Sequence, residues 1–506
     1  MILGLLPLLL LQAAAPSPSP SPSPAAADAD KKDKDKKEEE EKPIVTRQEL
    51  KVGGRVLKYT VTTGLMPLKD KAGESEARIF YMAYVADRTG GPETRPLTFS
   101  FNGGPGSASV WLHLGALGPK RVAMQADGAM PQPPYKLVDN ENTWLDTTDL
   151  VFIDPVGTGY SRPAKPDLGK KFWGVQGDIE SVGEFIRLYL TRYERWGSPL
   201  FMVGESYGTT RAAGLSGYLV DQGIAFNGIL LVSSILNFQT AVFAQGNDLP
   251  YVLYLPTYTA TAWYHKKLAG DLQADLARAL DESERFAAGD YANALARGSQ
   301  LQGAERAAIA QKVARLTGLE PRYVEETNLR VEIQRFCKEL LRSERRTVGR
   351  LDSRFKGVDD DAAGEQPGFD PSLAAIRPPY TAMFNDYVRR TLGYKSDQPY
   401  YILGGGIGAW DWGGSTLAAD TSQALRSAFA KNPSMRLFVA SGYYDLATPY
   451  FATEYTLGHM GLDPAQRARV ASHRYAAGHM MYIHEGELAK LKADVAAFFK
   501  AALAAN

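Results

Sequence analysis

Hydrophobic residues along the chain follow two kinds of pattern, one typical of strands and one typical of helices. Residues 55–61 and 77–85 alternate or are rich in β-branched and aromatic side chains, which is typical of antiparallel strands. Shorter apolar runs predict further strands at residues 97–101, 149–153, 200–203, 229–232 and 435–440. Helical patterns lie between several of these runs, notably at 178–195 and 209–221. Strands that alternate with helices predict an α/β protein with a mainly parallel central sheet flanked by helices.

This alternation lapses between residues 241 and 400. Helical segments rich in Ala, Leu, Glu and Arg dominate there, at residues 271–297, 304–316 and 331–346. We therefore predict an inserted helical cap at 241–400. It divides the sheet domain into a first part at 43–240 and a second part at 401–506.

The first 42 residues differ in composition from the rest. An apolar run at 2–11, followed by small residues, predicts a signal peptide at 1–15, although no basic residue precedes the run. The run is too short to predict a stable membrane span. Pro-Ser repeats and a dense mixed-charge run make 16–42 a predicted disordered linker. These features predict export to the periplasm or out of the cell.

Charge and cysteine content exclude some classes of function. The 57 Lys and Arg residues balance the 57 Asp and Glu residues, so no basic field predicts binding to nucleic acid. The single cysteine, Cys337, excludes an internal disulfide. It lies in a helical stretch without a nearby histidine, which indicates a packing residue rather than a catalytic thiol.

The most specific chemical signal is the sequence Gly-Glu-Ser-Tyr-Gly at residues 204–208, which lies between an apolar run and a helix of small residues. A strand, a Gly-x-Ser-x-Gly turn and a helix form the nucleophile elbow of the α/β-hydrolase fold. In this elbow the glycines permit a sharp bend that exposes the serine hydroxyl. Ser206 is therefore the predicted nucleophile, and an α/β-hydrolase fold with an inserted helical cap is the predicted fold.

A serine nucleophile needs a base, which in this fold is a histidine after the last strand. Of six histidines, His479 lies between a predicted last strand at 470–475 and a predicted last helix at 485–502. His484 is the alternative, but its place beside the helix start favours a capping or surface role. His473 is predicted to lie within the strand.

The acid that orients the base should follow the preceding strand. Asp445 comes after the predicted strand at 435–440 and a glycine, whereas Asp463, in Leu-Asp-Pro, is typical of a helix N-cap. Taken alone, Asp445 is equally typical of a turn. Its position in the chain relative to Ser206 and His479 favours the role of the orienting acid.

A glycine-rich loop follows the predicted strand at 97–101. The reaction needs backbone N–H donors for the oxyanion, one from Tyr207 after the nucleophile and one from such a loop. Three glycines among the four residues 103–106 indicate that a ligand approaches the backbone closely.

Five stretches of the chain carry a family resemblance. They occur in the family's order at residues 102–106, 152–161, 204–208, 442–445 and 477–480. With these motifs the chain resembles the serine carboxypeptidases, from about residue 97 to residue 482.

The resemblance implies a role for each of eight residues. It makes Ser206, Asp445 and His479 the catalytic triad, and the amides of Gly104 and Tyr207 the oxyanion-hole donors. It also implies that Asn102, Glu205 and the Gly103 amide bind the terminal carboxylate of the substrate. Since two close anions repel, Glu205 binds a carboxylate only if one of the two is protonated. Such a site favours acidic pH for peptide substrates.

Three positions depart from the family's pattern. Ala116 stands where a second acid is expected, Ser100 where a tryptophan is common, and Ser107 where a cysteine usually follows the glycine loop. The first two bear on the strength of carboxylate recognition and leave the triad intact. The third agrees with a protein that has no disulfide.

The predicted function is a serine-type carboxypeptidase that acts on peptides with a free C-terminus, without a metal or another cofactor. A serine esterase or acyltransferase with the same triad is the alternative, and a catalytically silent binding protein is a third. The loop at 154–161 is predicted to support the site structurally. Trp410 and Trp412 either line the pocket or belong to the core.

Overall fold

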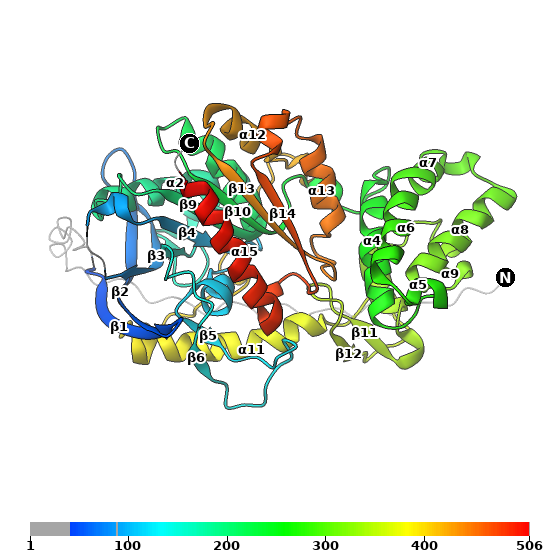
Figure 1. Cartoon of the computed structure of the whole chain (residues 1–506), viewed down its shortest axis with the longest axis horizontal. Coiled ribbons are helices and arrows are strands. Elements are labelled where there is room, and N and C mark those ends of the chain that lie inside the picture. Colours follow the sequence, from blue (N-terminus) through cyan, green and yellow to red (C-terminus); the bar gives the residue numbers. More distant parts are fainter. Residues whose placement is uncertain (1–40, 88–89, 505–506) are drawn as a thin grey trace, which may run out of the picture. The chain divides into compact units, whose positions relative to one another are not determined.

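The structure is a computed structural model that describes residues 41–87 and 90–504. The predicted signal peptide and most of the predicted linker lie outside these residues. Within them, ten strands form one sheet (Figure 1). Nine of them follow each other across the sheet in the order β1 (Ile44–Val52), β2 (Arg55–Lys69), β3 (Ser75–Ala86), β7 (Asp149–Ile153), β4 (Leu97–Phe101), β9 (Leu200–Ser206), β10 (Gly228–Ser234), β13 (Arg436–Gly442) and β14 (Val470–Tyr475). The tenth, β8 (Arg162–Pro163), pairs with β3.

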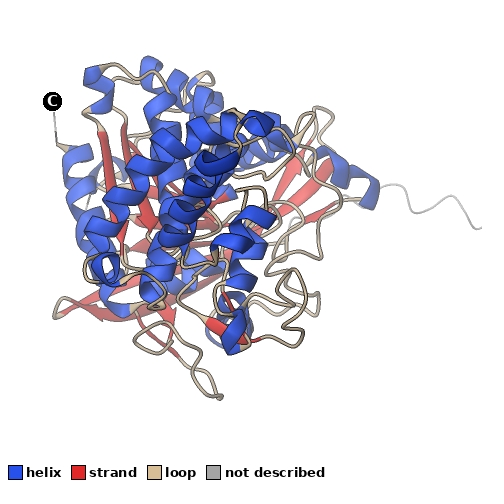
Figure 2. Ribbon diagram, turned by 90° about the vertical axis from the view of Figure 1, so that its right-hand side faces the viewer, coloured by secondary structure: helices blue, strands red, loops and turns tan. Residues whose placement is uncertain are grey.

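The sheet is mixed, with parallel pairing from β7 to β14. The three leading strands pair antiparallel, and β3 also pairs antiparallel with β7. All later neighbours pair in parallel. This arrangement, with helices on both sides of the strands (Figure 2), confirms the predicted α/β-hydrolase fold.

Side chains of the parallel strands alternate between two apolar layers, because successive residues of a strand point to opposite faces. On β9, Phe201 and Val203 pack in the layer that includes Leu491 and Val495 of α15 (Glu485–Leu503). Met202 packs in the opposite layer. That layer also holds the buried faces of α2 (Val175–Arg192), α3 (Tyr207–Val220) and α12 (Ser422–Lys431).

The segment between β10 and β13 contains helices with a core of their own. These are α4 (Leu249–Tyr264), α5 (Gly270–Gln273), α6 (Leu276–Phe286), α7 (Ala292–Ala296), α8 (Gly303–Thr317), α9 (Pro321–Glu326) and α10 (Ile333–Glu339). They share an apolar cluster in which Tyr258 stacks on Phe336. Figure 1 shows most of them gathered beside the sheet.

The end of this segment belongs to the sheet domain's core. Helix α11 (Pro371–Asp386) packs Ile376, Tyr380 and Phe384 into the same layer as α15. The helix predicted at 331–346 is shorter than expected, because the chain turns after α10 through Arg345 (φ 53°) into a hairpin. The hairpin strands are β11 (Arg346–Val348) and β12 (Lys356–Val358).

The remaining elements are short connections around the core. They are α1 (Val110–Leu112), α13 (Tyr450–His459), α14 (Pro464–Arg467), and the hairpin of β5 (Lys120–Val122) and β6 (Leu137–Asp139). Cys337 is buried in α10, where burial raises the pKa of its thiol, so the packing role predicted for it is confirmed.

Candidate active site

Ser206 lies at the sharp turn from β9 into α3. Its backbone adopts φ 60° and ψ −131°, a conformation that residues with a side chain rarely adopt. Such strained conformations are found mostly at functional turns. Two glycines permit the turn. A Cβ on Gly204 would lie 2.1 Å from the carbonyl oxygen of Gly208, and one on Gly208 would lie 2.9 Å from that of Phe101. The elbow therefore requires glycine on both sides of Ser206.

Asp445 lies in the loop after β13 and is fully buried. Its Oδ1 accepts the backbone N–H groups of Ala447 and Thr448 at 2.8 and 3.0 Å. Its Oδ2 accepts the Thr448 hydroxyl at 2.7 Å and lies 2.8 Å from Nδ1 of His479. Four donors therefore surround this carboxylate and fix its orientation toward the imidazole.

His479 lies in the loop after β14 and is held on both sides of its peptide group. Its backbone N–H donates to the Leu351 carbonyl at 2.6 Å, and its carbonyl accepts the Ser233 hydroxyl at 2.6 Å. Burial alone would lower the pKa of the imidazole, but the charge and hydrogen bond of Asp445, with a smaller effect of Glu205, raise it above its usual range.

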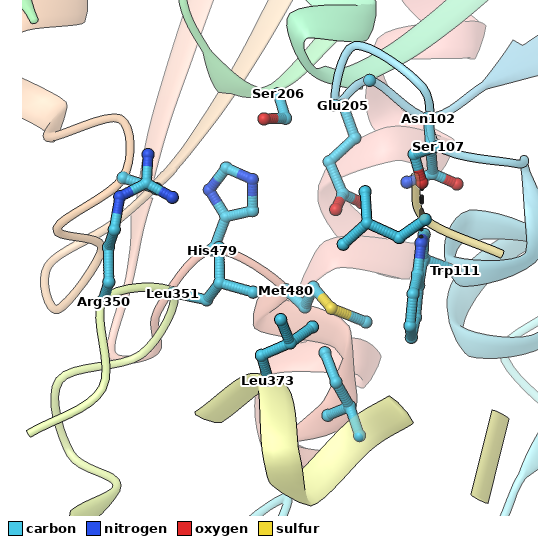
Figure 3. Close-up of a pocket in the computed structure, with 15 residues that line it drawn as sticks. Asn102, Ser107, Trp111, Glu205, Ser206, Arg350, Leu351, Leu373, His479 and Met480 are labelled. Carbon is cyan, nitrogen blue, oxygen red and sulfur yellow. Dashed lines mark hydrogen bonds between the residues drawn. The ribbon is translucent and has the colours of Figure 1, made fainter. Parts of the chain in front are cut away.

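Ser206 and His479 line one cavity of about 150 Å³. Figure 3 shows the Ser206 side chain beside the imidazole ring. The cavity is also lined by Asn102, Gly103, Gly104, Ser107, Trp111, Glu205, Arg350, Leu351, Leu373, Ile376, Leu403, Ala447 and Met480. His479, the predicted base, is thus bonded through one ring nitrogen to Asp445 and shares a cavity with Ser206, the predicted nucleophile.

The glycine-rich loop after β4 packs directly on the elbow. A Cβ on Gly103 would lie 2.4 Å from the amide nitrogen of Tyr207, so any side chain there would push the loop away. Gly104 has φ +101°, in the region that favours glycine. The structure therefore brings the loop that carries Gly104 against Tyr207, the two residues expected to donate to an oxyanion.

Glu205, the residue before the nucleophile, is 3% exposed. The Tyr482 hydroxyl donates to its Oε2 at 2.5 Å. Burial raises the pKa of Glu205 to about 7, while hydrogen bonds from Tyr482 and Asn102 and the positive charge on His479 pull it the other way. Glu205 therefore gains or loses its proton close to neutral pH.

Asn102 is anchored by its backbone and by one side-chain atom. Its Oδ1 accepts the Leu112 N–H at 3.0 Å, which leaves the side-chain N–H₂ group as the donor toward Glu205. Its backbone carbonyl accepts the Arg211 guanidinium at 2.7 Å. Arg211 is itself paired with Asp178 at 2.7 Å, and both side chains are buried. Through the Asn102 carbonyl, this buried ion pair anchors the start of the glycine loop.

Three residues near the site were not predicted from the sequence. Thr448 bridges Asp445 and the imidazole, and its only sequence signal is its place three residues after the acid. Tyr482 follows His479 by three residues and gives no motif of its own. Arg350 comes from the segment between β10 and β13, whose path to the cavity has no signal in the sequence.

The structure also answers the smaller predictions. Asp463 caps α14 through a capping box, as predicted. His473 lies in β14, as predicted, and His484 precedes α15 without a side-chain cap bond. Trp410 and Trp412 pack with the Tyr207 ring in a small apolar cluster rather than along the cavity.

Asp154 and the turn at Gly115 and Ala116 lie near the glycine loop and Tyr482. Asp154 accepts the Ser109 N–H at 2.8 Å, and burial raises the pKa of this carboxyl to about 7. The loop at 154–161 thus holds the segment that follows the glycine loop, and its support of the site stays a prediction. Ala116 is buried, and a Cβ on its neighbour Gly115 would lie 2.5 Å from the Tyr482 ring. The turn that lacks the expected acid thus packs on the tyrosine that binds Glu205.

The fold, the serine elbow and the Asp445–His479 pair define the class as the proteins of the α/β-hydrolase fold. Within this class the chain belongs to the serine carboxypeptidase family, whose profile matches residues 54–495. The departures at Ala116 and Ser100 thus occur within the family.

Relatives with curated names match shorter stretches. The chain is 34% identical over 158 residues to the pheromone-processing carboxypeptidase KEX1 of Saccharomyces cerevisiae, which covers 28% of this chain and 20% of that protein. It is 30% identical over 156 residues to serine carboxypeptidase-like 16 of Arabidopsis thaliana, which covers 30% of this chain and 33% of that protein. The matches therefore span a third or less of these relatives.

The fold has a counterpart among solved structures. A crystal structure of KEX1, described as a prohormone-processing carboxypeptidase from Saccharomyces cerevisiae, superposes with a TM-score of 0.55 and 17% identity. The superposition covers 87% of this chain and 91% of that one.

The described residues were also searched for membrane spans and metal sites. None of the helices in residues 41–87 and 90–504 has both the length and the apolar character needed to cross a membrane. Across the same ranges, no group of three or more His, Cys, Asp or Glu side chains is arranged to hold a metal ion.

Proposed function

We propose that this protein is a serine-type carboxypeptidase that releases C-terminal residues from peptides through an acyl-enzyme intermediate. One observation carries the proposal: the cavity that contains Ser206 and His479 is also lined by Glu205 and Asn102. A nucleophile and a carboxylate-binding pair in one cavity suit a substrate that is cut one residue from its carboxyl end.

The triad would work as in other serine hydrolases. The Ser206 hydroxyl attacks the scissile carbonyl while His479 takes its proton, and Asp445 stabilises the resulting imidazolium. The amides of Gly104 and Tyr207 would stabilise the oxyanion of the tetrahedral intermediate. His479 then donates the proton to the leaving amine, and water hydrolyses the ester on Ser206 with His479 again as the base.

Glu205 would act as the proton-dependent receptor for the terminal carboxylate. When protonated, it donates a hydrogen bond to a carboxylate, and when ionised, it repels one. Its pKa of about 7 keeps it protonated in mildly acidic solution. Protonation also removes the negative charge that raises the pKa of His479, and so favours the neutral imidazole that the reaction needs. The active form therefore combines protonated Glu205 with neutral His479.

Blocked dipeptides and the same dipeptides as C-terminal amides test the proposal. We expect the free acids to be cleaved faster than the amides, and the preference to decline as pH rises above about 7. Ester hydrolysis should persist to higher pH, because an ester has no terminal charge. Preference for the amides, or cleavage of internal bonds alone, would contradict a carboxypeptidase.

A serine esterase or acyltransferase is the second candidate. It is favoured by Ala116 and Ser100, which remove side chains expected to strengthen carboxylate capture. Since esters carry no terminal charge, Glu205→Gln would then leave the main activity and its pH profile nearly unchanged. A silent binding protein is the third candidate. Labelling of Ser206 by a fluorophosphonate, lost in Ser206→Ala, would exclude it.

Export is part of the proposal and rests on the apolar run at residues 2–11. We expect the protein to be recovered outside the cytoplasm without its first residues. Mass spectrometry of the intact protein from cell fractions measures this directly, and a cytoplasmic protein of full length would contradict it.

A further inference from the structure

A positively charged side chain reaches the cavity opposite Glu205. Arg350 lines the cavity and is exposed. In Figure 3 it lies on one side of Ser206 and His479, and Glu205 lies on the other. Among the described residues, no hydrogen bond or ion pair engages its guanidinium. By contrast Arg354, four residues later, is paired with Asp352 at 2.6 Å.

The backbone around Arg350 is tied to both loops that carry the triad. The Arg350 carbonyl accepts the N–H of Leu446, the residue after Asp445, at 3.1 Å. The carbonyl of Leu351 accepts the N–H of His479 at 2.6 Å. The backbone of Arg350 is therefore held in a fixed relation to Asp445 and His479 and is not the tip of a loose loop.

One acidic group on which the charge of Arg350 acts is already engaged by other donors. Glu332 caps α10, where its Oε2 accepts the N–H groups of Gln334 and Arg335 at 2.8 and 3.3 Å. The charge of Arg350 acts on Glu332 and on His479, lowering the pKa of each group, yet forms no ion pair with either. The guanidinium is thus a cation beside the cavity with unused donors.

The direction of the substrate follows from the proposed function, on which this inference rests. If the terminal carboxylate binds at Asn102 and Glu205, the leaving residue occupies that side of Ser206. The residue that becomes esterified to Ser206 then extends toward Arg350. We propose that Arg350 is a specificity-determining residue that favours an acidic side chain, Glu or Asp, immediately before the scissile bond.

Three blocked dipeptides that end in Leu and differ only in the preceding residue, Glu, Gln or Lys, test this at about pH 6. At that pH the Glu side chain is ionised. We expect kcat/KM to decrease in the order Glu, Gln, Lys, with about a five- to tenfold step from Glu to Gln. The preference should weaken at high salt, since the guanidinium is exposed. These measurements need no variant.

Substitutions sharpen the test. Arg350→Gln should bring the Glu and Gln substrates within about twofold of each other, and Arg350→Glu should make the Lys substrate better than the Glu substrate. Arg322→Gln is the control. Arg322 lies on α9 and is exposed, and its substitution makes the same change in net charge, so the order of the three substrates should stay unchanged. Labelling of Ser206 by a fluorophosphonate verifies that each variant is folded.

The outcomes separate this inference from the proposed function. Equal rates for the Glu and Gln substrates in the unaltered protein would overturn the role of Arg350 and leave the carboxypeptidase standing. An equal change for all three substrates in Arg350→Gln would also overturn it, because Arg350 would then act only through the pKa of His479. Failure to cleave any of the dipeptides, with Ser206 still reactive, would overturn the proposed function itself.

Discussion

Two buried carboxyl groups beside the same imidazole have opposite surroundings. Asp445 accepts hydrogen bonds from Ala447, from Thr448 twice, and from His479. Glu205 is almost as deeply buried, but among the described residues its donors are Tyr482 and Asn102, and burial raises its pKa to about 7. Glu205 thus has fewer donors than Asp445 at a similar depth of burial, and its burial leaves it as a group that exchanges its proton near neutrality.

Removing the charge of Asp445 should have the largest effect. Asp445→Asn would keep the shape of the loop but favour the wrong tautomer of His479, and kcat should fall by about 10⁴-fold. Steady-state kinetics on an ester and a blocked dipeptide measure this. Asp463→Asn, at the cap of α14, is the matched control and should leave kcat unchanged. A loss below tenfold in Asp445→Asn would mean that this carboxylate does not orient the base.

Glu205→Gln replaces a group that exchanges a proton with one that cannot. Its amide donates at every pH. The fall in peptidase kcat/KM that we propose above pH 7 for the unaltered protein, about tenfold for each pH unit, should therefore disappear. The pH profile for an ester substrate should change little and is the internal control. If the peptide profile still falls above pH 7, a group other than Glu205 controls it.

Tyr482→Phe removes a hydrogen-bond donor from Glu205. It should therefore shift the fall in peptidase kcat/KM that we propose above pH 7. The hydroxyl favours the ionised carboxylate, so its loss raises the pKa of Glu205 further. We expect the fall in peptidase activity to shift to higher pH by about one unit. Tyr475→Phe, which breaks a bond to Asp494 away from the cavity, should leave the profile in place. A shift toward lower pH in Tyr482→Phe would reverse the sign of the argument.

Thr448→Val should have the smallest effect. It removes one of the four hydrogen bonds to Asp445 and retains the Thr448 backbone N–H bond. We expect kcat to fall by about three- to tenfold, the cost of one hydrogen bond to a charged group. Thr453→Val, which removes a hydroxyl bonded to the Ser234 carbonyl, is the control. An effect as large as that of Asp445→Asn would show that the hydroxyl, and not the set of donors, holds the acid.

The strands and helices that depend on the pattern of their own residues were predictable from the sequence. Apolar runs predicted β4 and β7 to the residue, because buried parallel strands are bounded by polar turns. The bounds of β14, a half-buried strand at the edge of the sheet, were predicted from its place before the last helix. Strand β1 was missed, since its alternation of half-buried and exposed residues includes charged side chains of an edge strand. The stop of α10 at Glu339 was missed because the following hairpin depends on contacts distant in the sequence.

The residues of the candidate site also fall into two groups, those that a local motif predicts and those that tertiary packing brings to the cavity. Ser206 ends a strand, and Asp445 and His479 each follow one, all in short motifs. The structure brings Asp445 to His479, and it brings Ser206 and His479 to one cavity. Tyr482 and Arg350 were not predictable, since their roles depend on where a turn and an inserted segment meet the cavity. Motifs identify groups that react, and tertiary packing identifies groups that tune them.

The hydrogen bond from the His479 amide to the Leu351 carbonyl crosses from the last loop of the sheet domain into the inserted segment. A shortened protein made by excising that segment would lose an anchor of His479, the proposed base, even if Ser206, Asp445 and His479 were all retained. In chimaeras that replace the insertion with that of another protein, the residues around Leu351 should be retained, and the junctions should not fall within them.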